Sequence, residues 1–470
     1  MKAVEDYVRS LGLDAYLVGG AVRDELLGRE SKDADFLVPG VDAHTLRERL
    51  APHGRVEDLV VAGRLVGMRL YPRDREIRAL APAGIEFAPP RREQSTGPGR
   101  HDFEIVVDPD ATVEDDLARR DFTVNAIARH LEDGHLVDPH GGREDLERGI
   151  LRTVSPRSFA EDPLRLVRGL RFVSQLGLDP DEDTRAQMHE EARAVALVSG
   201  ERIGGGLAAD GMGELSKLLL GREPRRALRL ARDTGVLVEL LPEFERAVGF
   251  DQESRYHDLS VDEHTFAVVQ AAADKGAPLR VRLAALFHDL GKPHVAWRGD
   301  DSRLHFYARH GRRDHAEVSA KFAGDAMRRL RYPNDLRERV VRIVRFHMLD
   351  IGRGDAVRAR KLLHRFGDGL TLDLLDHKEA DLIGKGEDGP RDRTELESLR
   401  RFRTVVEDEL ESPHRVSDLA VDGTDLISLG YQPGPEIGKA LAELLEEVVE
   451  QPHLNRRDAL LARAEELLRQ

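Results

Sequence analysis

Residues suited to phosphate chemistry occur near the start of the chain, where a glycine turn precedes two aspartates. Gly19 and Gly20 follow the apolar run Tyr16–Val18, so the backbone could approach a ligand there without an intervening side chain. A glycine turn that opens a helix also offers free N–H groups to a phosphate. Asp33 and Asp35 should share one face of a strand, where Mg²⁺ would relieve their repulsion. Together these features predict phosphoryl or nucleotidyl transfer by two metal ions.

The elements that must position these residues are those of an α/β domain. A strand at Tyr16–Val18 should lead through the turn into a helix over 21–27 that Gly28 ends. A glycine turn or an Asp-x-Asp pair alone is usually structural, and it is their order along the chain that favours function. We further expect a helix at Ala43–Leu50, paired strands over 54–70 that turn at Gly63 or Gly67, strands at 85–87 and Phe103–Val107, and a flexible charged loop over 88–102.

Other polar residues of this part of the chain could complete such a site. Glu86, on the expected strand 85–87, is a candidate third carboxylate, although a surface glutamate fits the pattern equally well. The polar run 115–127 is expected to enter an apolar helix. Arg120 and Asp121 lie in it, and such residues suit phosphates and sugar hydroxyls respectively. A plain capped helix would explain this run equally well.

From about residue 150 the pattern becomes helical. One helix is expected to begin at Asp162, with Pro163 in its first position. Asp162 and Arg165 are three residues apart and should therefore share a helical face, which Arg168 continues. A capping aspartate with a surface arginine is the simpler alternative.

A set of histidines and aspartates in the middle of the chain predicts a metal site. Its members are His264, the doublet His288 and Asp289, then His315, His347 and Asp381. Imidazoles combined with carboxylates suit Mn²⁺, Ni²⁺, Co²⁺ or Fe²⁺ better than Ca²⁺. Asp376 competes with Asp381 for the last position, and single buried histidines are usually core residues. Further histidines that could contact a substrate phosphate or simply be exposed are His257, His294, His305 and His310.

Composition sets the bounds on these interpretations. At 470 residues the chain should hold several domains, and the absence of cysteine excludes disulfides and thiolate metal sites. The net charge of −15 argues mildly against RNA binding, yet the distribution of the arginines matters more than the sum. The first residues contain no apolar signal segment, and no run is long enough to span a membrane. We therefore expect a cytoplasmic protein without a membrane partner.

The strand–turn–helix–strand stretch resembles the signature of the DNA polymerase β-like nucleotidyltransferases. More closely, it resembles the bacterial class II tRNA nucleotidyltransferase (CCA-adding enzyme) and poly(A) polymerase family, and the His-Asp doublet resembles the HD metal-dependent phosphohydrolases. Three further runs resemble motifs of the tRNA nucleotidyltransferase family: 115–127, 136–146 and 159–172. Residues 199–203 and 214–218 resemble its neck motif, which is normally a single helical run. The resemblance implies an α/β head with a mixed sheet at 1–150, an all-α neck at 151–235, an HD helical domain at 236–400 and a helical tail at 401–470.

This resemblance also implies an activity: template-independent addition or repair of the 3′-terminal CCA of tRNA from CTP and ATP, with the RNA recognised by shape. Asp33 and Asp35 would then hold two Mg²⁺ ions. The nucleotide would bind to Gly19, Gly20, Arg23 (oriented by Asp24), Arg120, Asp121, Asp162, Arg165 and Arg168. The histidine set would hold a divalent transition metal such as Mn²⁺ or Ni²⁺.

The base-reading pair has a physical rationale. Cytosine and adenine each present an amino donor beside a ring-nitrogen acceptor, which Asp162 and Arg165 could serve, whereas uracil and guanine reverse that pattern. Three alternatives stay open: a poly(A) polymerase, a CC-adding or A-adding specialist, and a protein that is chiefly an HD phosphohydrolase. A non-catalytic RNA-binding protein is disfavoured, because it has no use for aligned carboxylates.

Overall fold

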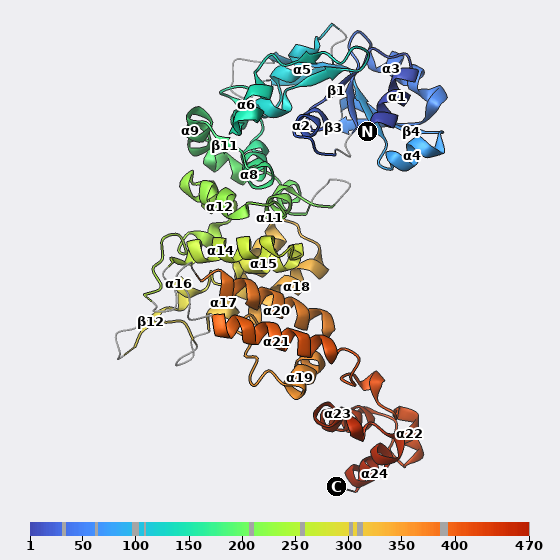
Figure 1. The fold of residues 1–470 in the computed structure, drawn as a ribbon, viewed down its shortest axis with the longest axis vertical. Helices are drawn as coiled ribbons and strands as arrows, with labels where there is room; N and C mark the ends of the chain where they lie inside the picture. The colour runs from blue at the N-terminus through green and yellow to red at the C-terminus, as the bar shows by residue number, and fades with distance from the viewer. Residues whose placement is uncertain are drawn as a thin grey trace. The chain divides into compact units, whose positions relative to one another are not determined.

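The structure is a computed structural model that describes residues 1–30, 34–61, 64–95, 103–107, 110–205, 211–253, 259–299, 304–307, 314–385 and 393–469. These residues form two compact units, Met1–Pro242 and Glu243–Gln470 (Figure 1). Asp33, His257 and His310, which the sequence analysis singled out, lie outside the described residues. Within the described ranges, no helix has both the length and the apolar character needed to cross a membrane.

A mixed sheet forms the head of the first unit. Its strands are β1 Tyr16–Val18, β2 Asp35–Leu37, β3 Gly54–Val61, β4 Arg64–Pro72, β5 Ile85–Ala88, β8 Ala128–His130 and β9 Leu136–Val137. They lie in the order β3-β4-β5-β2-β1-β8-β9. β2 and β5 run parallel, which sets Asp35 opposite Glu86, and the other neighbouring pairs are antiparallel. The predicted α/β head with a mixed sheet is confirmed.

Helices pack their apolar side chains against this sheet. Val8 and Leu46, from two of these helices, join a core with Phe36 and Phe87, whose ring centroids are 5.6 Å apart. Burying each such side chain contributes about 1.5–3 kcal/mol. The helices of the head are α1 Lys2–Ser10, α2 Gly20–Leu26, α3 Ala43–Leu50, η1 Ala51–His53, α4 Arg75–Leu80, α5 Val113–Ala118, η2 Thr123–Asn125 and α6 Gly142–Arg148.

The paired strands expected over 54–70 are present as β3 and β4; of the two positions expected for their turn, Gly67 lies inside β4 and Gly63 lies outside the described residues. Two local predictions about the head are wrong. The loop expected over 88–102 contains a strand, β6 Arg91–Ser95, because pairing with β7 Phe103–Val107 satisfies the backbone of both segments. The apolar helix expected within 115–127 is also absent: α5 precedes the arginines, and pairing with β1 draws the following residues into β8.

The rest of the first unit is almost wholly helical. Its elements are β10 Ile150–Leu151, α7 Ser158–Glu161, α8 Leu164–Leu176, β11 Asp179–Pro180, α9 Glu182–Glu190, η3 Ala192–Leu197, α10 Gly200–Ile203, α11 Glu214–Leu219, α12 Pro224–Asp233 and α13 Val236–Leu240. α8 packs against α11 and α12. The helix expected to begin at Asp162 begins at Leu164, because the Asp162 carboxylate accepts the Leu164 N–H at 3.1 Å from outside the helix.

Helices also build the second unit, around α15. The residues of α15 from Val281 to Phe287, Arg282 included, are buried, and the helix packs against α14, α17, α18 and α20. The elements of this part are η4 Pro242–Phe244 at the boundary, α14 Val261–Asp274, α15 Leu279–Phe287, α16 Lys292–Val295, β12 Trp297–Arg298, β13 Leu304–His305, α17 His315–Arg329, α18 Asn334–Arg345, α19 Ala356–Phe366, α20 Asp368–Ile383 and α21 Arg393–Asp408.

The end of the second unit has a small core of its own, in which Leu426, Leu444 and Leu460 are buried. Its helices are η5 Val416–Asp418, α22 Gly423–Ser428, α23 Pro435–Glu450, η6 Pro452–Leu454 and α24 Arg457–Leu468. α23 packs against α19, where the Arg360 Nε donates to the Val449 carbonyl at 2.7 Å. The amphipathic helices expected over 437–449 and after Asn455 are therefore present.

Candidate functional site

A cavity of about 740 Å³ in the first unit gathers the predicted head residues that the structure describes. Its walls include Gly19, Gly20, Arg23, Asp35, Glu86, Arg120, Asp121, Asp162, Arg165 and Arg168. Among the described residues that line it, nine are Arg or Lys and five are Asp or Glu. This local cationic excess, in a chain of net charge −15, suits a polyanion such as a triphosphate.

The glycine turn lies directly against an arginine. Gly19 has a φ of 68°, and a Cβ at this position would lie 2.6 Å from Nη1 of Arg120. Arg23, one turn into α2, donates to the Asn125 amide oxygen at 2.7 Å and to Asp24 at 2.7 and 2.9 Å. These contacts hold both guanidinium groups beside the bare backbone, where a phosphate could receive N–H groups from each.

Substituting Gly19 with alanine should separate backbone strain from nucleotide binding. Gly28 provides a matched control, because its φ is 65° but a Cβ there meets nothing within 4 Å. Both alanine variants should lose about 1–3 kcal/mol of unfolding free energy, measured in urea. Only Gly19→Ala displaces Arg120 and should weaken CTP binding, by about 10–100-fold in equilibrium dialysis. Equal CTP affinities in the two variants would contradict a role for the Gly19 turn and Arg120 in nucleotide binding.

The acidic edge of the sheet lies in the same cavity. Asp35 is exposed at the start of β2, and Glu86 lies opposite it on β5. Glu86 also forms an ion pair with Arg69. Oxygen donors of this kind are what Mg²⁺ requires, so the described residues fit that ion.

Asp121 and Arg168 form an ion pair in the same cavity, in which the Asp121 carboxylate is buried and the Arg168 side chain is partly exposed. The Asp121 carboxylate accepts from Arg168 Nε at 2.7 Å, from the Asn125 amide at 3.0 Å and from the Phe122 N–H at 2.9 Å. Burial alone would raise the pKa of Asp121, but the charge of Arg168 and these hydrogen bonds lower it to about 2. Asp121 therefore positions Arg168 and keeps both groups charged at neutral pH.

Removing this carboxylate should lower the free energy of unfolding and change how it depends on pH. Folding lowers the pKa of Asp121, so the ionised carboxylate adds about 2 kcal/mol to the free energy of unfolding above pH ~4. This contribution is lost as the pH falls to ~2. Asp121→Asn should lower the unfolding free energy at pH 7 by about 3–5 kcal/mol, since Arg168 then lies beside an uncharged group. Urea unfolding between pH 7 and 2 measures both effects. Asp58→Asn, at an exposed pair with Arg47, is the control, and an equal loss there would contradict this account.

The expected base-reading pair is engaged with other protein groups. Asp162 forms a two-point contact with Arg202, at 3.0 and 3.3 Å. Arg165 donates to the Arg119 carbonyl at 2.6 Å and to Glu161 at 3.2 Å. Both side chains line the cavity, but an incoming base must replace some of these contacts. Arg202 lies in the run 199–203 of the neck motif, which is the only sequence signal that could have indicated it.

Sequence reasoning also missed the residue that organises the arginines. Asp116 is buried and pairs with Arg91 at 3.5 Å, and with Arg119 and Arg120 at 3.2 Å each. These charges, with desolvation opposing them, keep the pKa of Asp116 low. On α8, the Phe172 ring lies under the guanidinium groups of Arg23, Arg168 and Arg171, at 5.3, 5.7 and 4.5 Å from its centroid.

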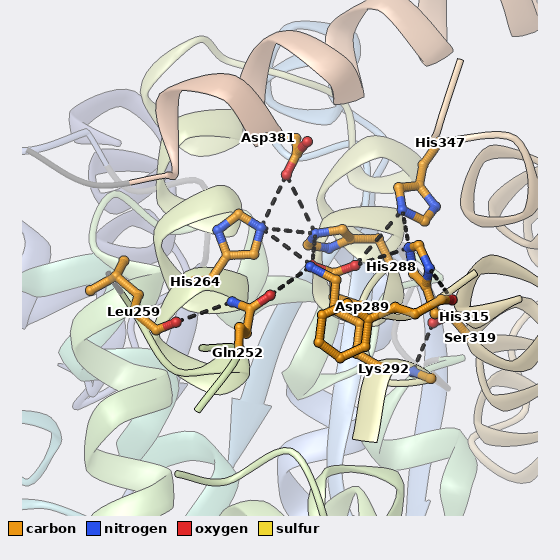
Figure 2. Close-up of polar contacts among 12 residues, drawn as sticks. Gln252, Leu259, His264, His288, Asp289, Lys292, His315, Ser319, His347 and Asp381 are labelled. Carbon is orange, nitrogen blue, oxygen red and sulfur yellow. Dashed lines mark hydrogen bonds and ion pairs between the residues drawn. The ribbon is translucent and has the colours of Figure 1, made fainter. Parts of the chain in front are cut away.

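A second candidate site lies in the second unit, where residues of α14, α17 and α20 meet the segments that follow α15 and α18 (Figure 2). It contains all the predicted histidines and aspartates of the metal set. Their donor atoms form two groups, each within 4.8 Å: His264, His288 and Asp381, and then Asp289, His315 and His347. The structure therefore places Asp381, rather than Asp376, at this site; Asp376 pairs with Arg403.

Asp289 connects the two groups. Its Oδ2 lies 3.4 Å from His264 Nε2 and 3.2 Å from His288 Nε2. Its Oδ1 lies 3.5 Å from His315 Nε2 and 3.8 Å from His347 Nε2. Imidazole nitrogens and carboxylate oxygens that converge in this way fit divalent transition metals.

The charges at this site also favour a cation. Burial would lower the pKa of His288, but Asp289 and Asp381 raise it to about 10. Burial would raise the pKa of Asp289, but His288 and Lys292 hold it well below its usual range. Lys292 Nζ lies 2.7 Å from Asp289 and donates to Gln252 at 2.6 Å (Figure 2). The buried carboxylates thus draw positive charge from the neighbouring protein groups.

Sequence reasoning missed one more histidine, His377. It is fully buried, neither ring nitrogen has a hydrogen-bond partner, and its ring centroid lies 5.1 Å from that of His288 and 5.8 Å from that of His347. Burial is the main reason that its pKa falls to about 3. Its spacing of four residues before Asp381 on one helix was the available signal. Of the other candidates, His294 is exposed and His305 lies at a strand edge against Trp297.

Four family models match the chain in order. They are the poly A polymerase head domain at residues 15–152, the RNA and SrmB-binding site of polymerase A at 177–248, the HD domain at 261–383 and tRNA nucleotidyltransferase domain 2 at 397–464. The head and HD families imply dependence on divalent metal ions, and the described residues contain groups able to hold them.

Individual relatives are similar over most of the chain. A multifunctional CCA protein of Nitrosococcus oceani is 38% identical over 342 residues, 72% of this chain and 75% of its own length. One of Alkalilimnicola ehrlichii is 38% identical over 371 residues, 77% and 79% of the two chains. A crystal structure of the Bacillus stearothermophilus CCA-adding enzyme in complex with CTP has a TM-score of 0.67 at 26% identity and covers 99% of this chain and 96% of that chain. These similarities agree with the resemblance carried by the sequence motifs.

Proposed function

The chain belongs to the family of the multifunctional CCA proteins, and we propose that it adds or repairs the 3′-terminal C-C-A of tRNA, using CTP and ATP. The observation that carries this proposal is the cationic cavity, because the Gly19 turn, Asp35 and Arg165 all line it. Family relatives and a CTP-bound structural neighbour with the same fold support it. We also propose a cytoplasmic location, because tRNA is the substrate of the proposed reaction.

In this proposal the triphosphate binds where N–H groups and guanidinium groups converge. The Gly19–Gly20 backbone and Arg23 contact the phosphates, and Arg120 reaches the same position from the opposite side. Asp35, together with Asp33, would hold Mg²⁺, which when bound activates the attacking hydroxyl and neutralises the departing pyrophosphate. Arg168, held by Asp121, contributes a fixed charge that needs no reorganisation during the reaction.

Base selection follows from the hydrogen-bonding capacity of two side chains. The Asp162 carboxylate only accepts and the Arg165 guanidinium only donates, which matches the amino group and ring nitrogen of cytosine and adenine. Uracil and guanine would place acceptor against acceptor and donor against donor. For this to occur, Asp162 exchanges its contact with Arg202 for one with the base.

The direct test is to sequence the product ends after incubation of the protein with tRNA that lacks CCA, with CTP and with ATP. Addition of C-C-A is the expected result. Long adenylate tails would favour a poly(A) polymerase, and products that stop after C-C, or that require a preformed C-C end, would favour a specialist. No incorporation of either nucleotide would overturn the proposal. Incubation with UTP and GTP alone is the control and should leave the tRNA unchanged.

We propose a second activity for the HD domain, hydrolysis of phosphomonoesters or 2′,3′-cyclic phosphates. The observation that favours it is the pair of donor groups joined by Asp289, which would suit two transition-metal ions such as Mn²⁺ or Ni²⁺ side by side. Such ions, when bound, would supply a metal-activated water at neutral pH. Lys292 would contribute a buried positive charge close to the substrate phosphate.

The domain boundaries are also part of the proposal: a head at 1–150, a neck at 151–235, an HD domain at 236–400 and a tail at 401–470. Support comes from the order of the family models, at 15–152, 177–248, 261–383 and 397–464, and from the division of the described residues into two compact units after Pro242.

A further inference from the structure

A third cluster of metal-ligating side chains lies on the head, outside the nucleotide cavity. It consists of His130, Asp133 and His135, and we call it the His130 cluster. His130 ends β8, and a tight turn returns the chain so that the His130 N–H donates to the His135 carbonyl at 3.0 Å. Gly134, with a φ of 74°, makes this turn feasible. The short connection thus brings two imidazole rings to within 5.0 Å between centroids.

Both imidazoles face a single carboxylate oxygen. His130 Nδ1 and His135 Nδ1 each lie 2.7 Å from Asp133 Oδ1, and the His135 backbone N–H donates to the same atom at 3.1 Å. The donor atoms of the three side chains all lie within 4.8 Å of one another. Two nitrogen ligands and one carboxylate are the kind of set that holds Zn²⁺, Ni²⁺ or Cu²⁺ in proteins.

The ring of His130 lies between two carboxylates. Its Nε2 lies 2.9 Å from Asp14 Oδ1, and its Nδ1 lies 2.7 Å from Asp133 Oδ1. Because a carboxylate only accepts, Asp14 can hold a proton on Nε2, and the Nδ1 lone pair would then face the cluster, where it could coordinate an ion together with Asp133. Asp14 occupies the place of the outer carboxylate that commonly orients a metal-binding histidine.

We propose that the His130 cluster is a divalent transition-metal site, with His130 Nδ1, His135 Nδ1 and Asp133 as ligands and water completing the coordination. Asp133 and His135 are accessible, with side chains 63% and 49% exposed, so an ion can enter from solvent. Hard ions such as Mg²⁺ and Ca²⁺ prefer oxygen ligands and would not compete well. This site is independent of both activities proposed above.

Binding at this site would fix one end of a strand whose other end forms the nucleotide turn. Tyr16 of β1 pairs in register with His130 and contacts both imidazoles, at ring distances of 4.8 and 5.9 Å. Three residues later, the same strand passes into Gly19. A metal ion would therefore tie β1, β8 and the β8–β9 turn together, which assigns it a structural role in the head.

The test is a zinc titration of the full-length protein by calorimetry, with His135→Gln and Asp133→Asn compared with the parent. His44→Gln is the matched control, because His44 is an exposed histidine that contacts a single carboxylate, Glu48, at 3.3 Å. Both cluster variants should lose one equivalent of bound zinc or bind it at least about tenfold more weakly, and His44→Gln should not. The zinc-dependent rise in unfolding temperature should shrink in the same two variants.

Two features keep this test decisive. Asp289→Asn, which alters only the HD site, should leave the equivalent at the His130 cluster in place, and CTP addition should be unchanged in His135→Gln. If both cluster variants bind as much zinc as the parent, with equal affinity, the proposal is overturned, and the contacts of Asp133 are hydrogen bonds only. Because two different ligands are substituted, failure of one variant to fold does not decide the result.

Discussion

Asp35→Ala should lower the rate of CTP and ATP addition to tRNA by about 100- to 1000-fold, which is the loss expected when a group that stabilises transition-state charge is removed. The fold should survive, because Asp35 is exposed at the start of β2. CTP should still bind, since Gly19, Arg23 and Arg120 remain in place. Single-turnover incorporation of labelled CTP, together with equilibrium dialysis of CTP, measures the two effects separately.

Asp58→Ala is the matched control for this substitution. Asp58 is also a partly exposed aspartate of the same sheet, on β3, but it pairs with Arg47 and does not line the cavity. It should add CTP at the parent rate. Full activity in Asp35→Ala would show that the acidic edge plays no part in nucleotide addition, even if the tRNA product ends in C-C-A.

Asp289→Asn should lower the phosphohydrolase activity by at least about 100-fold and should reduce the transition-metal content of the HD domain. The reason is that both donor groups face this one carboxylate, through Oδ2 and Oδ1 respectively. Addition of C-C-A should be unaffected. Hydrolysis of a 2′,3′-cyclic nucleotide and of a phosphomonoester, with metal content by elemental analysis, gives the readout.

Stability must be followed in the same experiment. Asp289→Asn leaves Lys292 buried without its carboxylate, which should cost about 3–5 kcal/mol of unfolding free energy. His347→Gln alters the same site without stranding a lysine, and His294→Gln, at an exposed histidine nearby, is the control. If His347→Gln and His294→Gln hydrolyse equally fast, the HD site is not where hydrolysis occurs.

Local sequence signals predicted the head well where short-range chemistry determines the structure. Tyr16–Val18 is a strand because it is a short apolar run that ends at glycine, and Gly19 has the positive φ that the turn requires. The alignment of Asp35 with Glu86 depends on parallel pairing of β2 with β5, which the two strand predictions allowed but did not require. Strand pairing also explains the failure at Arg91–Ser95, where a charged, loop-like sequence forms a β-ribbon.

Long-range partners were the part that the sequence could not supply. Nothing near Asp162 indicates that Arg202 will hold its carboxylate, because the two lie 40 residues apart in sequence. Likewise, Asp116 pairs with arginines that precede it and follow it in the sequence, Arg91 and Arg119 among them. His377 lies at the HD site only because α20 packs against α15. The residue types at each site were predictable, whereas the contacts that orient them follow from tertiary packing.

The central claim is that the Gly19 turn and the acidic edge of β2 serve one incoming nucleotide. A crystal structure of the protein with CTP and Mg²⁺ tests it most directly. We predict the triphosphate against Gly19, Gly20 and Arg23, with Mg²⁺ between it and the carboxylates of Asp33 and Asp35. A nucleotide bound elsewhere, with Asp35 in solvent and without metal, would contradict the account.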